Sequence, residues 1–155
     1  MRSGIRLIQA FLIITLASCQ AAAPPSNVPA VIGEEIILAT QQSAVIRDAG
    51  LTVKLIGVSR DDRCPAEVEC VVSGPVTISL EVTNEKGKVV DLTLQTFTDG
   101  DGRSPAGQFE GIQNQQAYEG YLIRLLGVSP YPRSPTLPIK PADYRVTLTV
   151  EAHQD

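Results

Sequence analysis

Residues 76–83 read VTISLEVT, and this is the clearest structural signal in the chain. Apolar side chains occupy every second position, and polar side chains lie between them. Successive side chains of a β-strand point to opposite faces of a sheet, so this alternation predicts a strand with one buried face. The predicted inward residues are Val76, Ile78, Leu80 and Val82, and the predicted outward residues are Thr77, Ser79 and Glu81.

The same alternation recurs between residues 34 and 155. Residues 144–151 give a second strong strand, with Tyr144, Val146, Leu148 and Val150 predicted inward and Arg145, Thr147 and Thr149 outward. Further strands are predicted at 35–39, 44–47, 51–55, 90–94, 108–112 and 121–126. Their predicted inward residues are Val53, Leu55, Leu92, Leu94, Ile123 and Leu125.

Turn residues separate these strands. Asn84 to Gly87 and Asp48 to Gly50 have the composition of tight turns, and 99–105 that of a longer loop. About seven to eight short strands with regular turns predict an all-β domain over 34–155, a single antiparallel β-sandwich (Ig-like). A small closed β-barrel is the alternative.

Residues 1–18 are predicted to be a lipoprotein signal peptide. Arg2 and Arg6 precede the apolar run LIQAFLIITL at 7–16, which is too short to span a membrane. The next residues complete Leu-Ala-Ser-Cys, which resembles the bacterial lipobox, in which the cysteine carries the lipid. We therefore expect lipidation of Cys19 and attachment to a membrane through that lipid. Gln20 follows Cys19, and its resemblance to the bacterial sorting rule implies the outer membrane in an organism that has one.

Residues 19–33 are predicted to form the lipidated cysteine and a flexible tether. The stretch after Cys19 is uncharged, and Pro24, Pro25 and Pro29 oppose a helix and favour extended, solvated chain. An edge strand beginning at Val28 is the alternative.

Cys64 and Cys70 are predicted to form a disulfide. An exported protein meets oxidising conditions, and these two cysteines have no other ordered partner. Closing a loop of this length constrains the unfolded chain by roughly 2–2.5 kcal/mol. A redox or nucleophilic thiol is the alternative, but the spacing is not Cys-x-x-Cys.

The same segment carries a family resemblance. Residues 61–74 read DDRCPAEVECVVSG. They resemble the Asp-Ser-Arg-Cys-Pro-x-x-Val-x-Cys-x-Trp-x-Gly segment of small, largely uncharacterised bacterial lipoproteins, in which an alternating strand follows. The C-terminal strand that begins near Asp143 is also similar to theirs. The chain departs from the pattern at Val72, where that group has Trp, and at Asp61-Asp62. The resemblance implies an envelope lipoprotein and brings no activity with it.

Composition excludes several functions. The 155-residue chain has a net charge of −4, which is a poor basis for neutralising nucleic-acid phosphates. One histidine and three cysteines are too few for an ordinary Cys/His zinc site unless all four converge. We expect no metal, no cofactor and no nucleic-acid partner.

Candidate catalytic residues are few. His153 lies two residues from the end of the sequence, an unfavourable place for an oriented imidazole. Asp99 and Asp101 precede a glycine as in a calcium loop, but Arg103 occupies the next ligand position, so a polar turn is predicted.

Carboxylate pairs are the remaining possibility for catalysis. Asp61 and Asp62 are adjacent, so on a strand they point to opposite faces, and the flanking arginines favour charge balance. A site made only of acids could still assemble from Glu110, Glu119 and Asp143 if the fold brings them together. We expect that the chain is not an enzyme.

Residues 129–142 contain prolines at every third position from Pro132 to Pro141, the period of a polyproline II helix. A ligand for an aromatic groove is one interpretation. The interpretation that we favour is a stiff crossover that carries the chain from one sheet to the other.

The predicted function is a non-catalytic binding or envelope-support module on the outer side of a bacterial membrane. Its partner would be an envelope protein or a glycan. All aromatic residues after Cys19 lie between 97 and 144, and most are expected in the core, with Tyr131 the leading candidate for an exposed contact surface. The alternative is a small carboxylate-dependent hydrolase of the cell envelope.

Overall fold

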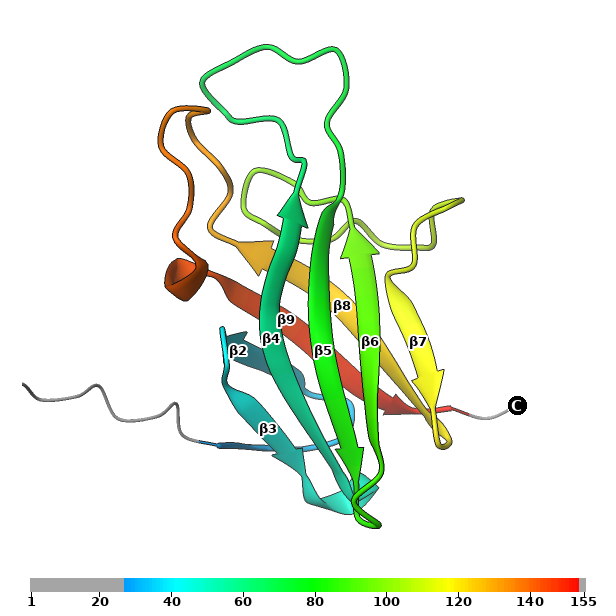
Figure 1. Ribbon diagram of the computed structural model, residues 1–155. Coiled ribbons are helices and arrows are strands. Elements are labelled where there is room, and N and C mark those ends of the chain that lie inside the picture. The colour runs from blue at the N-terminus through cyan, green and yellow to red at the C-terminus, as the bar shows by residue number, and fades with distance from the viewer. Residues whose placement is uncertain (1–26, 154–155) are drawn as a thin grey trace, which may run out of the picture.

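A computed structural model describes residues 27–153. The predicted signal peptide, Cys19 and residues 20–26 lie outside the described residues. The described chain forms two β-sheets packed face to face, as Figure 1 shows. The predicted antiparallel β-sandwich is therefore confirmed, and the sheets do not close into a barrel.

Each sheet has its own set of strands. The five-stranded sheet has the order β1-β3-β4-β5-β6, with bounds Val28–Ala30, Ser43–Ile46, Leu51–Asp61, Val76–Asn84 and Val89–Thr96. The four-stranded sheet has the order β2-β9-β8-β7, with bounds Glu35–Ala39, Arg145–Ala152, Tyr121–Ser129 and Gln115–Tyr118. Two short 3-10 turns occupy Arg47–Ala49 and Pro141–Asp143.

The core lies between the two sheets and is aliphatic. Every predicted inward residue is buried, and most are fully inaccessible. Burial of one such Val, Leu or Ile side chain contributes roughly 1.5–3 kcal/mol. The apolar residues of VTISLEVT are therefore the ones that face the core from β5, the strand between β4 and β6.

Two of the residues predicted to point outward are nevertheless buried. Thr77 and Thr149 lie on the outer faces of their sheets, as predicted, but are only 7% and 4% exposed. Each belongs to a central strand and has a long side chain beside it on the neighbouring strand. Gln95 donates a hydrogen bond from Nε2 to Oγ1 of Thr77 at 3.3 Å, and Arg124 is the cross-strand partner of Thr149. On the other side, Arg60 is the cross-strand partner of Thr77, and Glu35 is that of Thr149. Long side chains on both neighbouring strands thus cover each small threonine.

The strand predicted at 108–112 is also wrong. Phe109 and Ile112 instead form a tight turn, closed by a hydrogen bond from Ile112 N to Phe109 O at 3.0 Å. Gly107 and Gly111 on either side of Phe109 adopt positive φ, a conformation that opposes an extended strand. The strand in this region is β7, which begins at Gln115.

Residues 28–30, predicted as part of the flexible tether, form a strand. Val28 begins β1, which pairs in parallel with β3, so the alternative of an edge strand at Val28 is correct. Pro29 has no N–H to donate and is tolerated because β1 is an edge strand.

The crossover predicted for 129–142 is wrong as well. β8 and β9 are antiparallel neighbours in one sheet, with Ser129 opposite Arg145. The proline-containing segment therefore returns the chain to the sheet that it left.

The aromatic residues are less buried than predicted. Only Tyr144 lies in the core, and the other five are half-buried around its margin. Phe97 and Phe109 pack edge to face outside the core, with ring centroids 5.7 Å apart.

Candidate functional site

Residues 62–75, here called the disulfide loop, leave the end of β4 and project beyond the sandwich before β5 begins (Figure 1). Cys64 and Cys70 form the predicted disulfide, with their Cα atoms 5.9 Å apart. The base of the loop continues the β4–β5 pairing: Gly74 N donates to Asp62 O at 2.9 Å, and Cys64 N donates to Ser73 Oγ at 3.0 Å. The loop is therefore closed at its neck as well as by its disulfide.

A buried ion pair lies beneath this loop. The side chain of Arg63 is fully inaccessible, and its guanidinium donates to both carboxylate oxygens of Asp61, at 2.7 and 2.6 Å. Arg63 also donates to the backbone carbonyls of Val128 and Pro130, at 2.8 and 3.1 Å. One side chain thus fastens the disulfide loop to the end of β8.

The groups around Asp61 keep its carboxyl group ionised. Burial alone raises the pKa of a carboxyl group, but the hydrogen bonds and positive charge of Arg63 outweigh burial and lower the pKa of Asp61. The Tyr144 hydroxyl donates to Asp61 Oδ2 at 3.0 Å. Burial, with the adjacent carboxylate, raises the pKa of Tyr144 to about 12. Asp61 is an ionised structural group.

The two adjacent aspartates face different neighbours, as predicted. Asp61 points inward to Arg63, whereas Asp62 pairs with Arg60 at the surface. Their charges are balanced by the flanking arginines and do not form a paired-carboxylate site.

Tyr131 lies where the disulfide loop meets residues 130–141, here called the proline-rich loop. Its half-buried ring lies 5.1 Å from the Arg63 guanidinium carbon. The backbones of the two loops are joined by hydrogen bonds from Ala66 N to Pro132 O at 3.0 Å and from Glu67 N to Arg133 O at 2.9 Å. Tyr131 also borders a hollow of about 530 Å³, lined by Cys64, Pro65, Ala66, Val68, Gly100, Tyr131 and Arg133.

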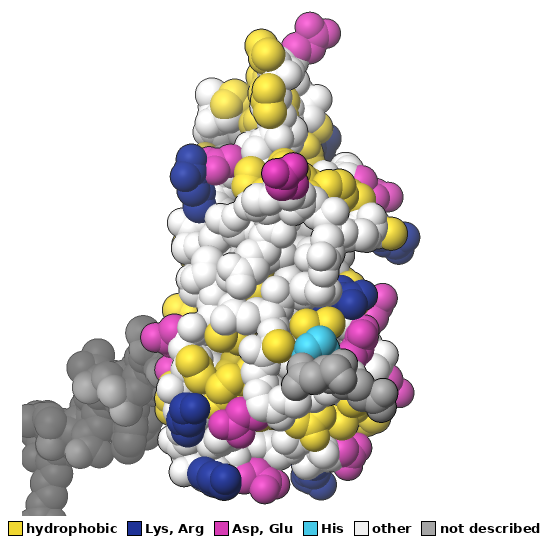
Figure 2. Space-filling view, turned by 90° about the vertical axis from the view of Figure 1, so that its right-hand side faces the viewer, with side chains coloured by type: hydrophobic (Ala, Val, Ile, Leu, Met, Phe, Trp, Pro, Cys, Tyr) yellow, Lys and Arg dark blue, Asp and Glu magenta, His cyan; other side chains and the backbone are white. Residues whose placement is uncertain are grey.

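The far end of the disulfide loop carries exposed valines. Val71 and Val72 are 103% and 78% exposed, and Val68 is 40% exposed. These three residues are called the apolar tip. Figure 2 shows hydrophobic side chains at this end of the molecule, with acidic side chains among them. Glu67 and Glu69 are the exposed acids next to the tip in the chain.

Sequence reasoning missed the apolar tip. The available signal was the pair Val71-Val72 directly after a disulfide cysteine and before Ser73-Gly74-Pro75. Two adjacent valines followed by turn residues cannot both face a core from a strand.

The carboxylates considered for catalysis are not brought together. Glu119 lies in the turn between β7 and β8, where it accepts hydrogen bonds from Asn84 Nδ2 at 2.9 Å. Asp143 precedes β9 at the opposite end of the same sheet, and Glu110 lies in the loop before β7.

The other candidates fill structural positions. Asp99 Oδ1 accepts the backbone N–H groups of Asp101 and Arg103, at 3.0 and 2.8 Å, as in the polar turn predicted there. His153 is exposed, and its backbone N–H donates to Gly120 O at 2.8 Å. Within residues 27–153, no three His, Cys, Asp or Glu side chains are grouped so as to hold a metal ion.

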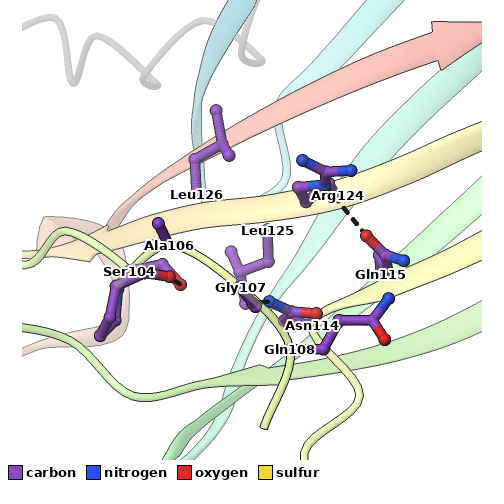
Figure 3. Close-up of a pocket in the computed structure, with 10 residues that line it drawn as sticks. Ser104, Ala106, Gly107, Gln108, Asn114, Gln115, Arg124, Leu125 and Leu126 are labelled. Carbon is purple, nitrogen blue, oxygen red and sulfur yellow. Dashed lines mark hydrogen bonds between the residues drawn. The ribbon is translucent and has the colours of Figure 1, made fainter.

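A second hollow lies beside β8, on the side of the loop that precedes β7. It encloses about 410 Å³ and is lined by Ser104, Pro105, Ala106, Gly107, Gln108, Asn114, Gln115, Arg124, Leu125 and Leu126. Figure 3 shows Arg124 directed to Gln115, with Nε donating to Oε1 at 3.0 Å. This site was not predicted from the sequence.

Comparisons with protein-family models, with curated proteins and with solved structures found no match to this chain. In the part of the chain that the structure describes, no helix has the length and apolar character needed to cross a membrane.

Proposed function

We propose that the chain is a lipid-anchored, extracytoplasmic binding module of the bacterial envelope, without catalytic activity, that docks a protein partner through the apolar tip. The anchor is proposed at Cys19, in the outer membrane where the organism has one. The observation that carries the docking proposal is the full exposure of Val71 on a loop that is closed by a disulfide and hydrogen-bonded to the proline-rich loop.

Rigid mounting of the tip favours binding. Exposed apolar side chains gain free energy when a partner covers them, and ordering a flexible loop would subtract from that gain. Here the disulfide, the loop-to-loop hydrogen bonds and the buried Arg63 have already ordered the loop. A buried ion pair is weak evidence of a stabilising purpose, since its desolvation offsets its attraction. Its position beneath the tip fits a role in holding the loop in one conformation.

The charge around the tip indicates the chemistry of the partner. Glu67 and Glu69 are exposed beside the valines, so a complementary surface has an apolar pocket bordered by Lys or Arg. The same two acids oppose insertion of the tip among anionic lipid headgroups. We therefore favour a protein partner over the bilayer. Tyr131 borders the adjoining hollow and is proposed as the edge of the contact surface.

The position of Val28, near the start of the described chain, supports this arrangement. Val28 lies opposite Ala44 in the ladder, and Ala44 lies opposite Val53. From Val53, β4 runs eight residues further to Asp61, about 26 Å at 3.3 Å per residue, before the disulfide loop begins. The proposed anchor therefore joins the sandwich far from the tip.

Site-specific photocrosslinking tests the docking proposal. The full-length chain would carry a benzophenone amino acid at Val72 or, as a control, at Thr93, an exposed position on β6. We expect one discrete protein adduct from position 72 and none from 93. Reversing the neighbouring charges with Glu67→Lys and Glu69→Lys should abolish the adduct, whereas Glu34→Lys, at an exposed acid remote from the loop, should not. Equal adducts at 72 and 93, lipid adducts alone, or indifference to the charge reversal would contradict it.

The anchor has its own test. Mass spectrometry of the mature N-terminus should show an acylated Cys19, and Cys19→Ser should move the protein from the membrane fraction to the soluble fraction. A free N-terminus at another residue, or identical fractionation of both forms, would contradict lipidation.

A further inference from the structure

The hollow beside β8 shares part of its lining with a second hollow. The second hollow, of about 460 Å³, is lined by Gln108, Phe109, Gly111, Ile112, Gln113, Asn114 and Gln115. Gln108, Asn114 and Gln115 line both hollows. We call the two adjoining hollows together the amide cleft. It is lined by none of the residues that form the apolar tip or the hollow at Tyr131.

An irregularity in β8 creates the cleft. The pairing of β8 with β9 shifts register between Leu125 and Gly127. On the edge of β8 that faces away from β9, Leu125 N donates to Asn114 O, whereas Leu126 O accepts from Ser104 N. The edge partner of β8 thus changes from residue 114 at Leu125 to residue 104 at Leu126, and residues 105–113 form a loop between these two partners. Bulges of this kind are common beside functional sites.

The cleft has a hydrogen-bonding group without a partner. Asn114 is 4% exposed, and its Nδ2 donates to Gly107 O at 3.0 Å. Its Oδ1 is buried and accepts no hydrogen bond from any described residue. Figure 3 shows the Asn114 carboxamide on the floor of the hollow beside Gly107 and below Gln115. A buried acceptor without a donor is costly, and a ligand hydroxyl or N–H would satisfy it.

The remaining polar side chains are amides, one cation and the hydroxyl of Ser104, which is hydrogen-bonded to Thr96 Oγ1 at 2.6 Å. Each carboxamide offers both a donor and an acceptor, and no carboxylate lines either hollow. Arg124 is bound to Gln115 and lies 3.8 Å from Glu151 on its other side. Its side chain is still 38% exposed. The cleft therefore matches ligands that are rich in groups able both to donate and to accept, and it disfavours cations.

We propose that the amide cleft binds an oligosaccharide. Sugar hydroxyls are donors and acceptors at once, which is the pattern that Gln108, Asn114 and Gln115 complement. The half-buried Phe109 ring offers an apolar surface for the C–H face of a sugar, and Leu126 does the same at the opposite end. Arg124 favours a chain with acetamido or carboxylate substituents over a plain glucan, because both present an oxygen acceptor. This site goes beyond the proposed docking at the apolar tip and does not depend on it.

Calorimetric titration tests this inference. The full lipidated chain, in a zwitterionic detergent without a sugar headgroup, is titrated with chitotetraose, tetragalacturonate and cellotetraose. We expect saturable binding of chitotetraose or tetragalacturonate with a dissociation constant in the millimolar range or below, and at least tenfold weaker binding of cellotetraose. Gln108→Ala with Gln115→Ala should weaken that binding at least tenfold. Asn27→Ala, an exposed amide at the start of the described chain, should leave it unchanged.

Three results would overturn the inference. They are no binding of any of the three tetrasaccharides, equal affinities in the double variant and the wild type, or an equal loss of affinity in Asn27→Ala. Thermal unfolding of each variant establishes that it is folded. If the double variant is unfolded, Gln108→Ala alone is titrated, because Gln108 is exposed and lies in a loop.

Discussion

Arg63 and Asp61, only two residues apart, form a two-point ion pair beneath the disulfide loop, and Asp62 between them turns outward to Arg60. The inner pair is shielded from water, and the outer pair is not. The inner pair also contacts Tyr144, just before the last strand, and the backbone carbonyls of Val128 and Pro130 at the end of β8. It therefore joins three segments that are far apart in the sequence and fixes the orientation of the loop that carries the apolar tip.

The inner and outer aspartates should differ greatly in their effect on stability. Asp61→Asn leaves the inaccessible Arg63 guanidinium without its counter-charge, and we expect a loss of about 3–5 kcal/mol in the free energy of unfolding. Asp62→Asn removes only an exposed partner and should cost less than about 1 kcal/mol. Urea unfolding followed by circular dichroism measures both values. Equal costs would contradict the buried ion pair.

Tyr144 should make stability sensitive to alkaline pH. Its pKa rises from 10.0 to about 12 in the folded chain. Above pH 10 the unfolded chain releases the phenol proton while the folded chain retains it, so stability falls as the pH rises from 10 to about 12. Tyr144→Phe has no phenol proton at this position and should lose less stability across that window, although it is less stable at neutral pH. Chemical unfolding at a series of pH values gives both slopes, and parallel slopes would contradict the assignment.

The fold could be predicted because the signal is local. Alternation along β5 and β9 indicates which side chains face the core, and Asn84 to Gly87 mark the turn that joins β5 to β6. Errors arose where the outcome depends on neighbours in space. The burial of Thr77 requires Gln95 beside it, and the return of the chain to the same sheet after Ser129 depends on the pairing of β8 with β9.

The candidate site was predictable only in part. The spacing of Cys64 and Cys70, in a chain that we predict to be exported, predicted their disulfide, which the structure contains. The partner of Asp61 depends on the turn at Asp62, which charge patterning does not specify. The amide cleft depends on a register shift in β8, and no residue type marks that shift in the sequence.

Gly102 should tolerate no side chain. It adopts a φ of +82°, and a Cβ atom there would lie 2.5 Å from the carbonyl oxygen of Val128. Gly102→Ala therefore forces the loop away from β8, and we expect a loss of more than about 1 kcal/mol, the usual scale for strain at a special backbone position. Gly100→Ala, two residues earlier, meets no atom within 4 Å and should be close to neutral. Thermal unfolding distinguishes the two, and equal melting temperatures would show that the loop is not packed on β8.

The two faces of β9 should respond differently to truncation. Leu148 is fully buried between the sheets, and Leu148→Ala should cost about 2–5 kcal/mol. Its neighbour Thr147 points to the outer face and is half-buried, so Thr147→Ala should cost less than about 1 kcal/mol. Thr149 on the same outer face is covered, and Thr149→Ala should fall between the two. Equal costs for Leu148→Ala and Thr147→Ala would contradict the register.

Removing the disulfide should lower the stability of the chain and, separately, weaken docking of the partner. Cys64→Ser with Cys70→Ser removes a constraint on a short loop, and roughly 2–2.5 kcal/mol of unfolding free energy should be lost. The sandwich should remain folded, because its core lies between the sheets and away from this loop. The valines of the tip would then be presented by a looser loop. Protease cleavage within 65–72 should therefore become faster, and the photocrosslink from position 72 should weaken.

A matched variant distinguishes the effect of loop rigidity on docking from the effect of direct contact between the valines and the partner. Val71→Ser with Val72→Ser removes the apolar surface while both cysteines stay paired, so unfolding free energy should change by less than about 0.5 kcal/mol at these exposed positions. Partner capture is measured in both variants with the benzophenone amino acid at Val68, the third residue of the tip. It should fall strongly in the valine variant and partly in the cysteine variant. Undiminished capture in the cysteine variant would show that the disulfide does not prepare the tip for its partner, and undiminished capture in the valine variant would show that the contact lies elsewhere on the molecule.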